Sequence, residues 1–95
     1  MKSLILTPAA KADMSDIWEY SRVNWGAEQA DSYTDDIEHR CIALASGHAS
    51  GRPVEVRPAY RKLPIGSHMI YFRESPDVVE VIRILHSRQD TDRHL

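Results

Sequence analysis

The sequence predicts an α+β domain in which a helical hairpin packs on a small, mainly antiparallel β-sheet. In the N-terminal half, apolar residues recur at helical spacing on both sides of a single glycine. The C-terminal half is rich in β-branched and aromatic residues, in short runs separated by turn signals. A chain of 95 residues holds one core, so we expect a single domain over residues 1–95.

A short strand followed by a long helix is expected at the start of the chain. Residues 2–6 are mostly apolar and precede a turn signal, which favours a strand. Thr7 is a suitable N-cap, and Pro8 suits the first helical position because its missing N–H costs nothing there. A helical stripe of apolar or small residues then runs through residues 10–25, and Gly26 is expected to break the helix.

A second helix is expected directly after this glycine. Residues 27–45 keep the helical period, with acidic residues on the other side, and Ser46-Gly47 is a plausible end. Two helices joined at one glycine form an antiparallel hairpin. Glycine, serine and proline in residues 46–53 then indicate a loop.

Three further strands are expected in the C-terminal half. Residues 60–64 form a candidate edge strand, since Pro64 cannot donate to a ladder. Residues 68–73 are rich in β-formers, and the nearly continuous apolar run of residues 78–86 favours a central strand. The predicted order is β-α-α-β-β-β. No helix remains for the sheet face opposite the hairpin, so that face is expected to be polar or to bind a partner.

Composition and charge exclude several classes of protein. Fourteen acidic and 12 basic residues give a net charge of −2, which argues against a strongly basic nucleic-acid binder. The charge is uneven: residues 1–50 carry a net charge of −4 and residues 51–95 carry +2. The one cysteine, Cys41, excludes an internal disulfide and favours a reducing compartment. No apolar run approaches the roughly 20 residues of a membrane span, so we expect a cytoplasmic protein without membrane contact.

The common catalytic and cofactor motifs are absent from the sequence. It has no Walker loop, no dinucleotide glycine pattern and no zinc-protease or nucleophile-elbow motif, so we expect no cofactor. His39 and Cys41 are two positions apart and would point to different faces of a helix. In the tail, Asp90, Asp92 and His94 alternate, and a solvated polar segment is favoured over a cation site. We therefore expect no metal site.

Arg83 is unusual because it interrupts the most apolar predicted strand. With a period of two it would share a face with Val79, Val81 and Leu85, where an arginine is costly unless its head reaches solvent or a partner. One interpretation pairs it with a carboxylate of the acidic hairpin. The other makes it an anchor for a partner's carboxylate or phosphate, together with Arg61, His86 and Arg88.

The two tryptophans allow a similar choice. Trp18 and Trp25 lie seven residues apart on the first predicted helix, where core packing is favoured for both. One exposed ring would instead be an interface anchor. Cys41 falls on the apolar stripe of the second helix and is expected to be an inert buried thiol.

Several segments, in order and spacing, resemble the ParE toxins of the ParE/RelE superfamily of toxin–antitoxin modules. The likeness covers nearly the whole chain. It is carried by residues 7–20, Trp25-Gly26 with Ala30, Asp31 and Tyr33, Gly51-Arg52-Pro53, Arg57-Pro58, Tyr60-Arg61, residues 66–73, and the ending of residues 82–90 with Arg93-His94-Leu95.

The resemblance implies the RelE/ParE-like fold and a bacterial toxin held inactive by a small, ParD-like antitoxin. It implies a module of the kind that stabilises plasmids, whose complex binds operator DNA mainly through the antitoxin. ParE-like toxins trap DNA gyrase on cleaved DNA, whereas RelE-like relatives cut messenger RNA on the ribosome. One scaffold hosts both activities, so fold alone does not choose between them.

The residues favour the gyrase inhibitor. RelE-like members use clustered lysine and arginine with a tyrosine near the C-terminus, but here Lys62 is the only lysine after Lys11 and no tyrosine follows Tyr71. His86 or His94 would have to substitute as acid or base. We therefore expect inhibition by binding, with no catalytic residue. The alternatives are a ribosome-dependent endoribonuclease and a non-toxic interaction module. The expected partner-binding residues are Trp18, Arg61, Arg83, His86, Arg88 and Arg93.

Overall fold

The computed structural model describes residues 1–89 and 91–95 of the chain. Its elements are β1 (Ser3–Leu6), α1 (Pro8–Trp25), α2 (Ala27–Ser46), β2 (Arg52–Val54), β3 (Arg57–Ile65), β4 (His68–Glu74), β5 (Val78–His86) and α3 (Thr91–His94). The predicted α+β class and the order of its elements are confirmed, with β2 and α3 as additions. Asp90 and the side chain of Asp92 lie outside the described residues, so the structure does not bear on that part of the polar tail.

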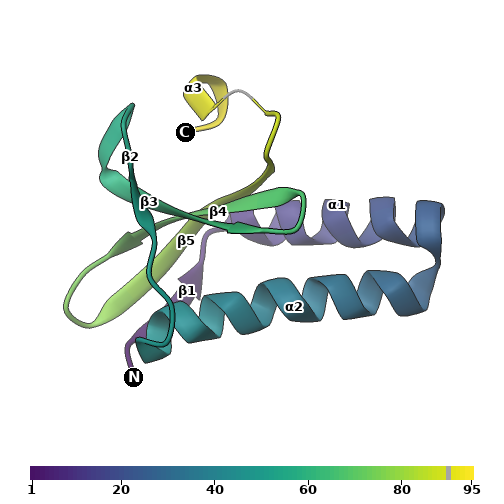
Figure 1. Cartoon of the computed structure of the whole chain (residues 1–95), viewed down its shortest axis with the longest axis horizontal. Coiled ribbons are helices and arrows are strands. Elements are labelled where there is room, and N and C mark those ends of the chain that lie inside the picture. Colours follow the sequence, from purple (N-terminus) through teal and green to yellow (C-terminus); the bar gives the residue numbers. More distant parts are fainter. Residues whose placement is uncertain (90) are drawn as a thin grey trace.

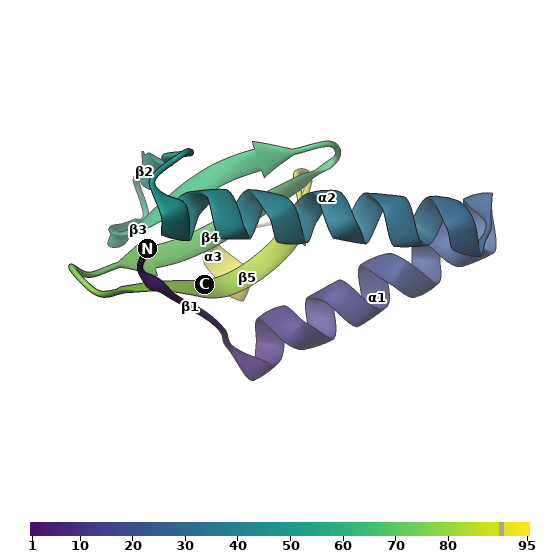
Figure 2. The ribbon, with the colours of Figure 1, turned by 90° about the horizontal axis from the view of Figure 1, so that it is seen from below.

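The elements form two layers (Figures 1 and 2). The sheet has the strand order β1-β5-β4-β3-β2, in which β1 pairs with β5 in parallel and all other neighbours are antiparallel. β5 lies between two strands, as its apolar run predicts. The α1–α2 hairpin covers one face of the sheet and its far end extends past the strands, while α3 lies on the side of the sheet away from the hairpin.

Thr7 joins the first strand, the first helix and β5. Its side-chain oxygen accepts a hydrogen bond from the Ala10 N–H at 3.0 Å, which is the predicted N-cap, and its hydroxyl donates to the Ile82 carbonyl at 2.7 Å. Its backbone N–H donates to the Val81 carbonyl at 3.0 Å. The start of α1 is thereby fixed against β5 by one residue.

Gly26 forms the whole connection between the two long helices. Its φ of +96° is a conformation that side chains disfavour, which explains the glycine. Its N–H donates to the Arg22 carbonyl at 2.9 Å, and its carbonyl accepts from the Ala30 N–H at 3.0 Å. It therefore closes one helix and opens the next.

No helix in the described part of the chain is long and apolar enough to cross a membrane.

The main core lies between the hairpin and the sheet. Cys41 belongs to it, as predicted, and burial raises the pKa of its thiol to about 11, so the thiol is protonated and unreactive near neutral pH. The buried side chains of this core are Ala10, Ile17, Ile37, Cys41, Leu44, Ala45, Leu63, Ile70, Phe72, Val79, Val81 and Ile84.

A β-bulge in β5 changes which side chains share a face. Tyr71 pairs with Arg83 and Phe72 pairs with Val81, so Ile82 is an extra residue in β5. Val81 consequently belongs to the main core, whereas Leu85 belongs to a second cluster. The prediction that Arg83 shares a face with Val79 and Val81 is wrong, because strict alternation does not continue through a bulge. Leu85, two residues after Arg83, does lie on the same face as Arg83.

The sheet face away from the hairpin is not the uncovered surface that the sequence predicts. It holds a small apolar cluster of Val54, Tyr71 and Leu85, against which Leu95 packs. The carbonyl of Leu95 also accepts a hydrogen bond from Arg57 Nε at 3.1 Å. The end of the described chain and β2 together cover part of this face.

The predicted edge strand is longer than expected and is only partly an edge. β2 pairs with β3 as far as Arg52 opposite Lys62, so only the part of β3 beyond Lys62 has no partner on that side. Pro64 falls in this unpaired part, in agreement with its missing N–H. The loop predicted over residues 46–53 overlaps β2, because a strand of three residues that contains Pro53 has no clear strand signal in the sequence.

We predict that Thr7→Ala lowers the free energy of unfolding by about 1–2 kcal/mol, because it removes both the N-cap and the bond to Ile82. Urea denaturation monitored by circular dichroism measures the change. Thr7→Ser keeps a hydroxyl and is the matched control. Equal destabilisation by both substitutions would contradict the hydrogen-bonding role.

Candidate functional site

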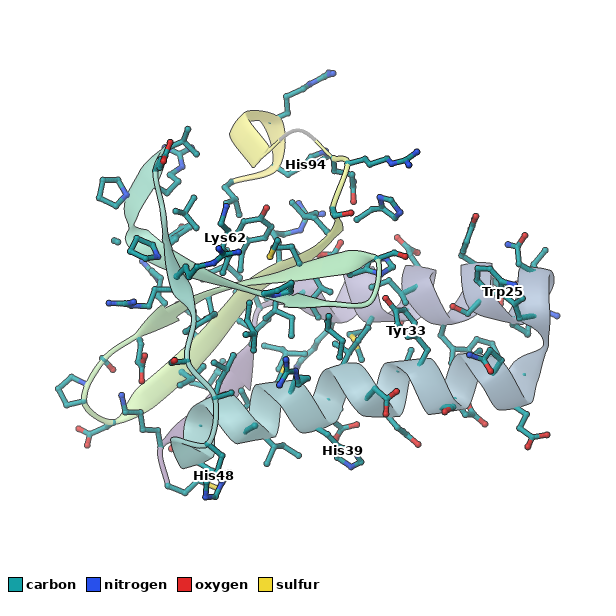
Figure 3. The ribbon with its side chains drawn as sticks, viewed as in Figure 1. Trp25, Tyr33, His39, His48, Lys62 and His94 are labelled. Carbon is teal, nitrogen blue, oxygen red and sulfur yellow. The ribbon has the colours of Figure 1, made fainter. Side chains whose placement is uncertain are left out.

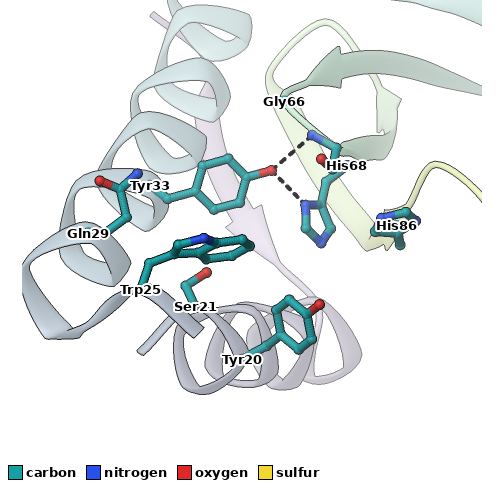
Figure 4. Close-up of a pocket in the computed structure, with 9 residues that line it drawn as sticks. Tyr20, Ser21, Trp25, Gln29, Tyr33, Gly66, His68 and His86 are labelled. Atoms are coloured by element: carbon teal, nitrogen blue, oxygen red, sulfur yellow. Dashed lines mark hydrogen bonds between the residues drawn. The ribbon is translucent and has the colours of Figure 1, made fainter. Parts of the chain in front are cut away.

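A groove of about 580 Å³ lies between the far half of the hairpin and the turn that connects β3 to β4 (Figures 3 and 4). We call it the aromatic groove. It is lined by Tyr20, Ser21, Trp25, Gln29, Tyr33, Gly66, Ser67, His68 and His86. A second hollow adjoins it and shares Tyr20, His68 and His86 with it.

Tyr33 links α2 to the β3–β4 turn. Its phenol oxygen lies 2.6 Å from His68 Nδ1 and accepts a hydrogen bond from the Ser67 N–H at 3.2 Å (Figure 4). The carbonyl of Ile65 lies 3.3 Å from the same phenol. Burial raises the pKa of Tyr33 above its ordinary value, so the phenol is neutral near neutral pH.

Gly66 permits this close contact. Its φ is +52°, and a Cβ built there would lie 2.7 Å from the Tyr33 phenol oxygen. Only glycine meets both conditions without displacing the tyrosine. Gly66 and Ser67 form the turn between β3 and β4, and this turn brings the sheet up to α2.

His68 and His86 lie opposite each other on two neighbouring strands. They are paired residues of β4 and β5, and their ring centroids are 5.4 Å apart in an edge-on arrangement. Burial lowers the pKa of His68, and the neighbouring His86 lowers it further, while Asp13 opposes the shift. His68 is therefore neutral over a wider pH range than a free histidine.

Arg83 is paired within the chain. Its Nε donates to Asp13 Oδ2 at 2.7 Å and its Nη2 donates to Asp13 Oδ1 at 2.8 Å, a bidentate pair between β5 and α1. The bond to Asp13 raises the pKa of Arg83. The interpretation that pairs Arg83 with a hairpin carboxylate is thus confirmed.

Asp13 also completes the edge of the sheet. Oδ2 accepts a third hydrogen bond from the Ile84 N–H at 2.9 Å. The last paired residue of β1 is Leu6, opposite Val81, so the next part of β5 has no strand on that side. A side chain from α1 therefore takes the place of a strand there.

The end of β5 and the turn after it hold two more of the predicted residues. The His86 N–H donates to Gln89 Oε1 at 2.6 Å, and the Arg88 N–H donates to His86 Nδ1 at 3.2 Å. Both His86 and Arg88 are exposed. Arg83 and His86 line the hollow that adjoins the aromatic groove, so the structure does bring these two residues together.

The other predicted residues lie elsewhere. Arg61 is exposed on β3, where its Nη1 donates to the Gly51 carbonyl at 3.2 Å, and Arg93 is exposed on α3. Trp18 is half-buried between the helices, and its Nε1–H donates to Asp31 Oδ1 at 2.8 Å. None of these three residues lines the groove.

Trp25 corrects the prediction that both tryptophans pack in the core. It is 65% exposed, because the far end of the hairpin extends past the sheet and no strand lies beneath it (Figures 1 and 3). Its ring contacts that of Tyr20 edge-on, at a centroid distance of 5.9 Å. These two rings form the helix side of the aromatic groove.

The sequence does not predict the Tyr33–His68 pair. The pattern places Tyr33 in the predicted helix of residues 27–45 and His68 in the predicted strand of residues 68–73. The available signal was the Gly66-Ser67 turn directly before His68, but nothing in the sequence joins it to a residue 35 positions earlier.

The described residues offer little for metal binding. Among residues 1–89 and 91–95, no group of three or more histidine, cysteine, aspartate or glutamate side chains is placed to hold a metal ion. What the groove does offer is imidazole nitrogen, a neutral phenol and apolar ring surface, which suit binding of a polar group beside an apolar one.

Comparisons with known proteins show the family of the chain. The family model described as the ParE toxin of the type II toxin–antitoxin system parDE matches residues 4–91. The chain belongs to the ParE toxin family. The Toxin ParE1 of Mycobacterium tuberculosis is 39% identical over 93 residues, which cover 96% of this chain and 95% of that protein.

Solved structures confirm the RelE/ParE-like fold. A structure described as the chromosomal ParDE TA system from P. aeruginosa matches with a TM-score of 0.80 and 29% identity, covering 90% of this chain and 96% of that one. The toxin–antitoxin complex RelBE2 from Mycobacterium tuberculosis matches with a TM-score of 0.55 and 16% identity, over 90% of this chain and 96% of that one. The second likeness concerns the fold alone.

We predict that Asp13→Ala lowers the free energy of unfolding by about 1–3 kcal/mol, because the Arg83 guanidinium and the Ile84 N–H both lose their acceptor. Thermal or urea denaturation measures the loss. Glu19→Ala, which breaks the solvent-exposed pair with Arg22, is the control and should change stability much less than Asp13→Ala, because water screens that pair. Equal effects of the two substitutions would show that Asp13 has no special role.

We predict that His68 makes the protein less stable in mild acid. Its pKa in the folded state lies below the ordinary 6.5, so the unfolded chain binds the proton more readily. The free energy of unfolding contributed by neutral His68 is complete above about pH 6.5 and is lost as the pH falls towards the folded-state pKa.

Urea denaturation at a series of pH values tests this dependence. His68→Asn, which cannot titrate in this range, should flatten the decline in stability below about pH 6.5. His39→Asn changes an exposed histidine on the outer side of α2 and serves as the control (Figure 3). Parallel pH curves for the wild type and His68→Asn would contradict the assignment.

Proposed function

We propose that this chain inhibits DNA gyrase by binding it and that a cognate antitoxin neutralises it. The observation that carries the proposal is the ParE family match over residues 4–91. ParE-like toxins are expected to trap gyrase on cleaved DNA and so block replication. No bond is broken by the toxin's own side chains in this mechanism.

The proposed gyrase-contacting surface combines the turn after β5 with the exposed arginines of the C-terminal half. His86 and Arg88 are exposed in and beside that turn, and Arg93 and Arg61 are exposed on α3 and β3. Their positive charge favours contact with acidic side chains of gyrase or with the phosphates of the DNA that gyrase holds. Arg83 is bonded to Asp13 and lines the hollow beside His86, so we propose that it supports this surface from within. Trp18 is bonded to Asp31 and lies between the two helices of the hairpin.

The proposed antitoxin is a small ParD-like protein that wraps the toxin. The hairpin exposes apolar side chains, and β1 and β2 are the two edges of the sheet, to which an added strand can pair. The exposed apolar residues of the hairpin are Tyr20, Val23, Trp25 and Ile42. Acidic antitoxin residues would pair with the C-terminal arginines, and the complex would bind operator DNA mainly through the antitoxin.

A ribosome-dependent endoribonuclease is the second candidate, because two imidazoles lie side by side near an arginine. Acid–base cleavage of RNA needs a proton acceptor, a proton donor and a cation near one phosphate. His68 and His86 have ring centroids 5.4 Å apart, and Arg83 lines the same hollow. Against this function, Asp13 neutralises the Arg83 guanidinium.

Purified toxin with gyrase and plasmid DNA tests the proposal, with a translating extract run in parallel. We expect loss of supercoiling and a trapped cleavage complex at micromolar toxin, reversed by the antitoxin, and intact transcripts. Discrete transcript fragments that vanish in His86→Ala, with gyrase turnover unchanged, would support the endoribonuclease instead. Normal growth on expression without antitoxin, with neither activity, would indicate a non-toxic interaction module.

We predict that Arg88→Ala combined with Arg93→Ala weakens gyrase inhibition by about tenfold or more, because two exposed cations leave the proposed contact surface. The toxin concentration that halves supercoiling measures the effect. Arg22→Ala removes an exposed arginine of α1 that is paired with Glu19, and it is the matched control. An equal loss of gyrase inhibition in the double variant and in Arg22→Ala would contradict a specific role for the C-terminal arginines.

A further inference from the structure

The aromatic groove carries hydrogen-bonding nitrogens on its sheet side and apolar rings on its helix side, and none of its nine lining residues is acidic. We propose that it is a peptide-binding site in which His68 and His86 together hold a carboxylate. The rings of Tyr20 and Trp25 would hold a neighbouring apolar side chain. The occupant is a partner-protein segment with an acidic residue next to an apolar one.

The hydrogen bond to His86 determines where its ring carries a proton. Nδ1 accepts from the Arg88 N–H at 3.2 Å, so this nitrogen is unprotonated. A neutral imidazole carries its one proton on the other nitrogen. His86 therefore presents Nε2–H as a donor, and its exposure leaves that donor accessible to a ligand.

The bonds around Tyr33 give the same result for His68. The phenol oxygen accepts from the Ser67 N–H, so its own proton goes to another acceptor. His68 Nδ1 is 2.6 Å away and the Ile65 carbonyl is 3.3 Å away, so we assign the proton to the shorter contact. Nδ1 of His68 is then an acceptor, and its Nε2 also carries a proton.

Two donors at this spacing suit one carboxylate. The ring centroids are 5.4 Å apart, close enough for the two oxygens of a single carboxylate to accept from both rings. The same arrangement disfavours a metal ion, because an imidazole that binds a metal through Nε2 keeps its proton on Nδ1. In His86 that position already accepts from Arg88.

The charges around the groove agree with an anionic ligand. Asp13, the carboxylate that acts on His68, is bonded to Arg83 and to the Ile84 N–H, so its charge is compensated. Asp16 lines the adjoining hollow and not the groove itself. The exposed Arg88 follows His86 directly and adds positive charge beside it.

The apolar part of the groove favours a peptide over a nucleic acid. Tyr20 and Trp25 are 63% and 65% exposed, so a partner side chain that covers them removes apolar ring surface from water. These rings belong to α1, within the half of the sequence that carries a net charge of −4. A nucleic acid carries a negative charge at every phosphate and is disfavoured along this acidic half, whereas the peptide needs only one carboxylate, which is placed at the histidines.

The groove would thus receive a segment of one of the toxin's protein partners, and in this respect the site depends on the proposed function. Binding of small probes is independent of gyrase inhibition, so failure of one leaves the other intact. If the toxin inhibits gyrase but binds no peptide probe, only the proposed peptide site is wrong. If the chain binds the probe but does not inhibit gyrase, only the proposed function is wrong.

Nuclear magnetic resonance titration of the ¹⁵N-labelled protein tests the site. The probe is a blocked dipeptide of phenylalanine and glutamate, compared with the same dipeptide carrying glutamine. We expect the glutamate probe to shift the amide signals of Ser67, His68 and Trp25 at up to about 10 mM, and the glutamine probe to bind about tenfold more weakly. Adenosine monophosphate is titrated as the nucleotide comparator.

Asparagine variants separate the Nε2 donor from the rest of each ring. His86→Asn and His68→Asn keep a short polar group near the position of Nδ1 but lose Nε2, and each should weaken glutamate-probe binding by about tenfold. His39→Asn, at an exposed site on α2, should bind like the wild type. The amide spectrum of each variant shows that it is folded.

Three results would overturn the proposal. The first is equal binding of the glutamate and glutamine probes. The second is unchanged binding by folded His86→Asn. The third is the absence of groove shifts with the glutamate probe while adenosine monophosphate produces them, which would make the groove a nucleotide site.

Discussion

The attachment of α1 along the open edge of β5 is the constraint on which the rest of the molecule depends. Thr7 bonds to Val81 and Ile82 at the start of the helix, and Asp13 bonds to Arg83 and Ile84 nearly two turns later. These contacts satisfy β5 where β1 no longer pairs with it. They also fix the direction of α1, and because Gly26 alone joins the helices, they constrain α2 as well.

The position of α2 in turn creates the aromatic groove. Tyr33 can form hydrogen bonds with His68 and Ser67 only because α2 runs back over the sheet next to the β3–β4 turn. Gly66 leaves room there for the ring of Tyr33. The far end of the hairpin then extends past the strands, which leaves Trp25 exposed in the groove that the two histidines also line (Figures 1 and 4). One set of contacts at the edge of the sheet thus determines both the core and the recognition surface.

Local signals in the sequence predicted the fold, and long-range contacts account for what they did not predict. The Thr7 cap, the Gly26 break and the period of each helix depend only on residues that are neighbours in the sequence. The sequence alone therefore predicts them. The bulge at Ile82, the three-residue β2 and the exposure of Trp25 depend on how distant segments meet. Arg83 lies between these cases: its chemistry indicated a carboxylate partner, but only the fold identifies Asp13.

The far half of the hairpin has an energetic consequence of its own. Between residues 18 and 36 the only buried side chains are Ser21 and Ala30, both small, which lets the helices approach closely but removes little apolar surface from water. Amide hydrogens in this segment will therefore exchange with solvent faster than those of β4 and β5. A protein that binds this part of the hairpin will slow the exchange of these amide hydrogens. Binding and local ordering are therefore thermodynamically coupled in this segment.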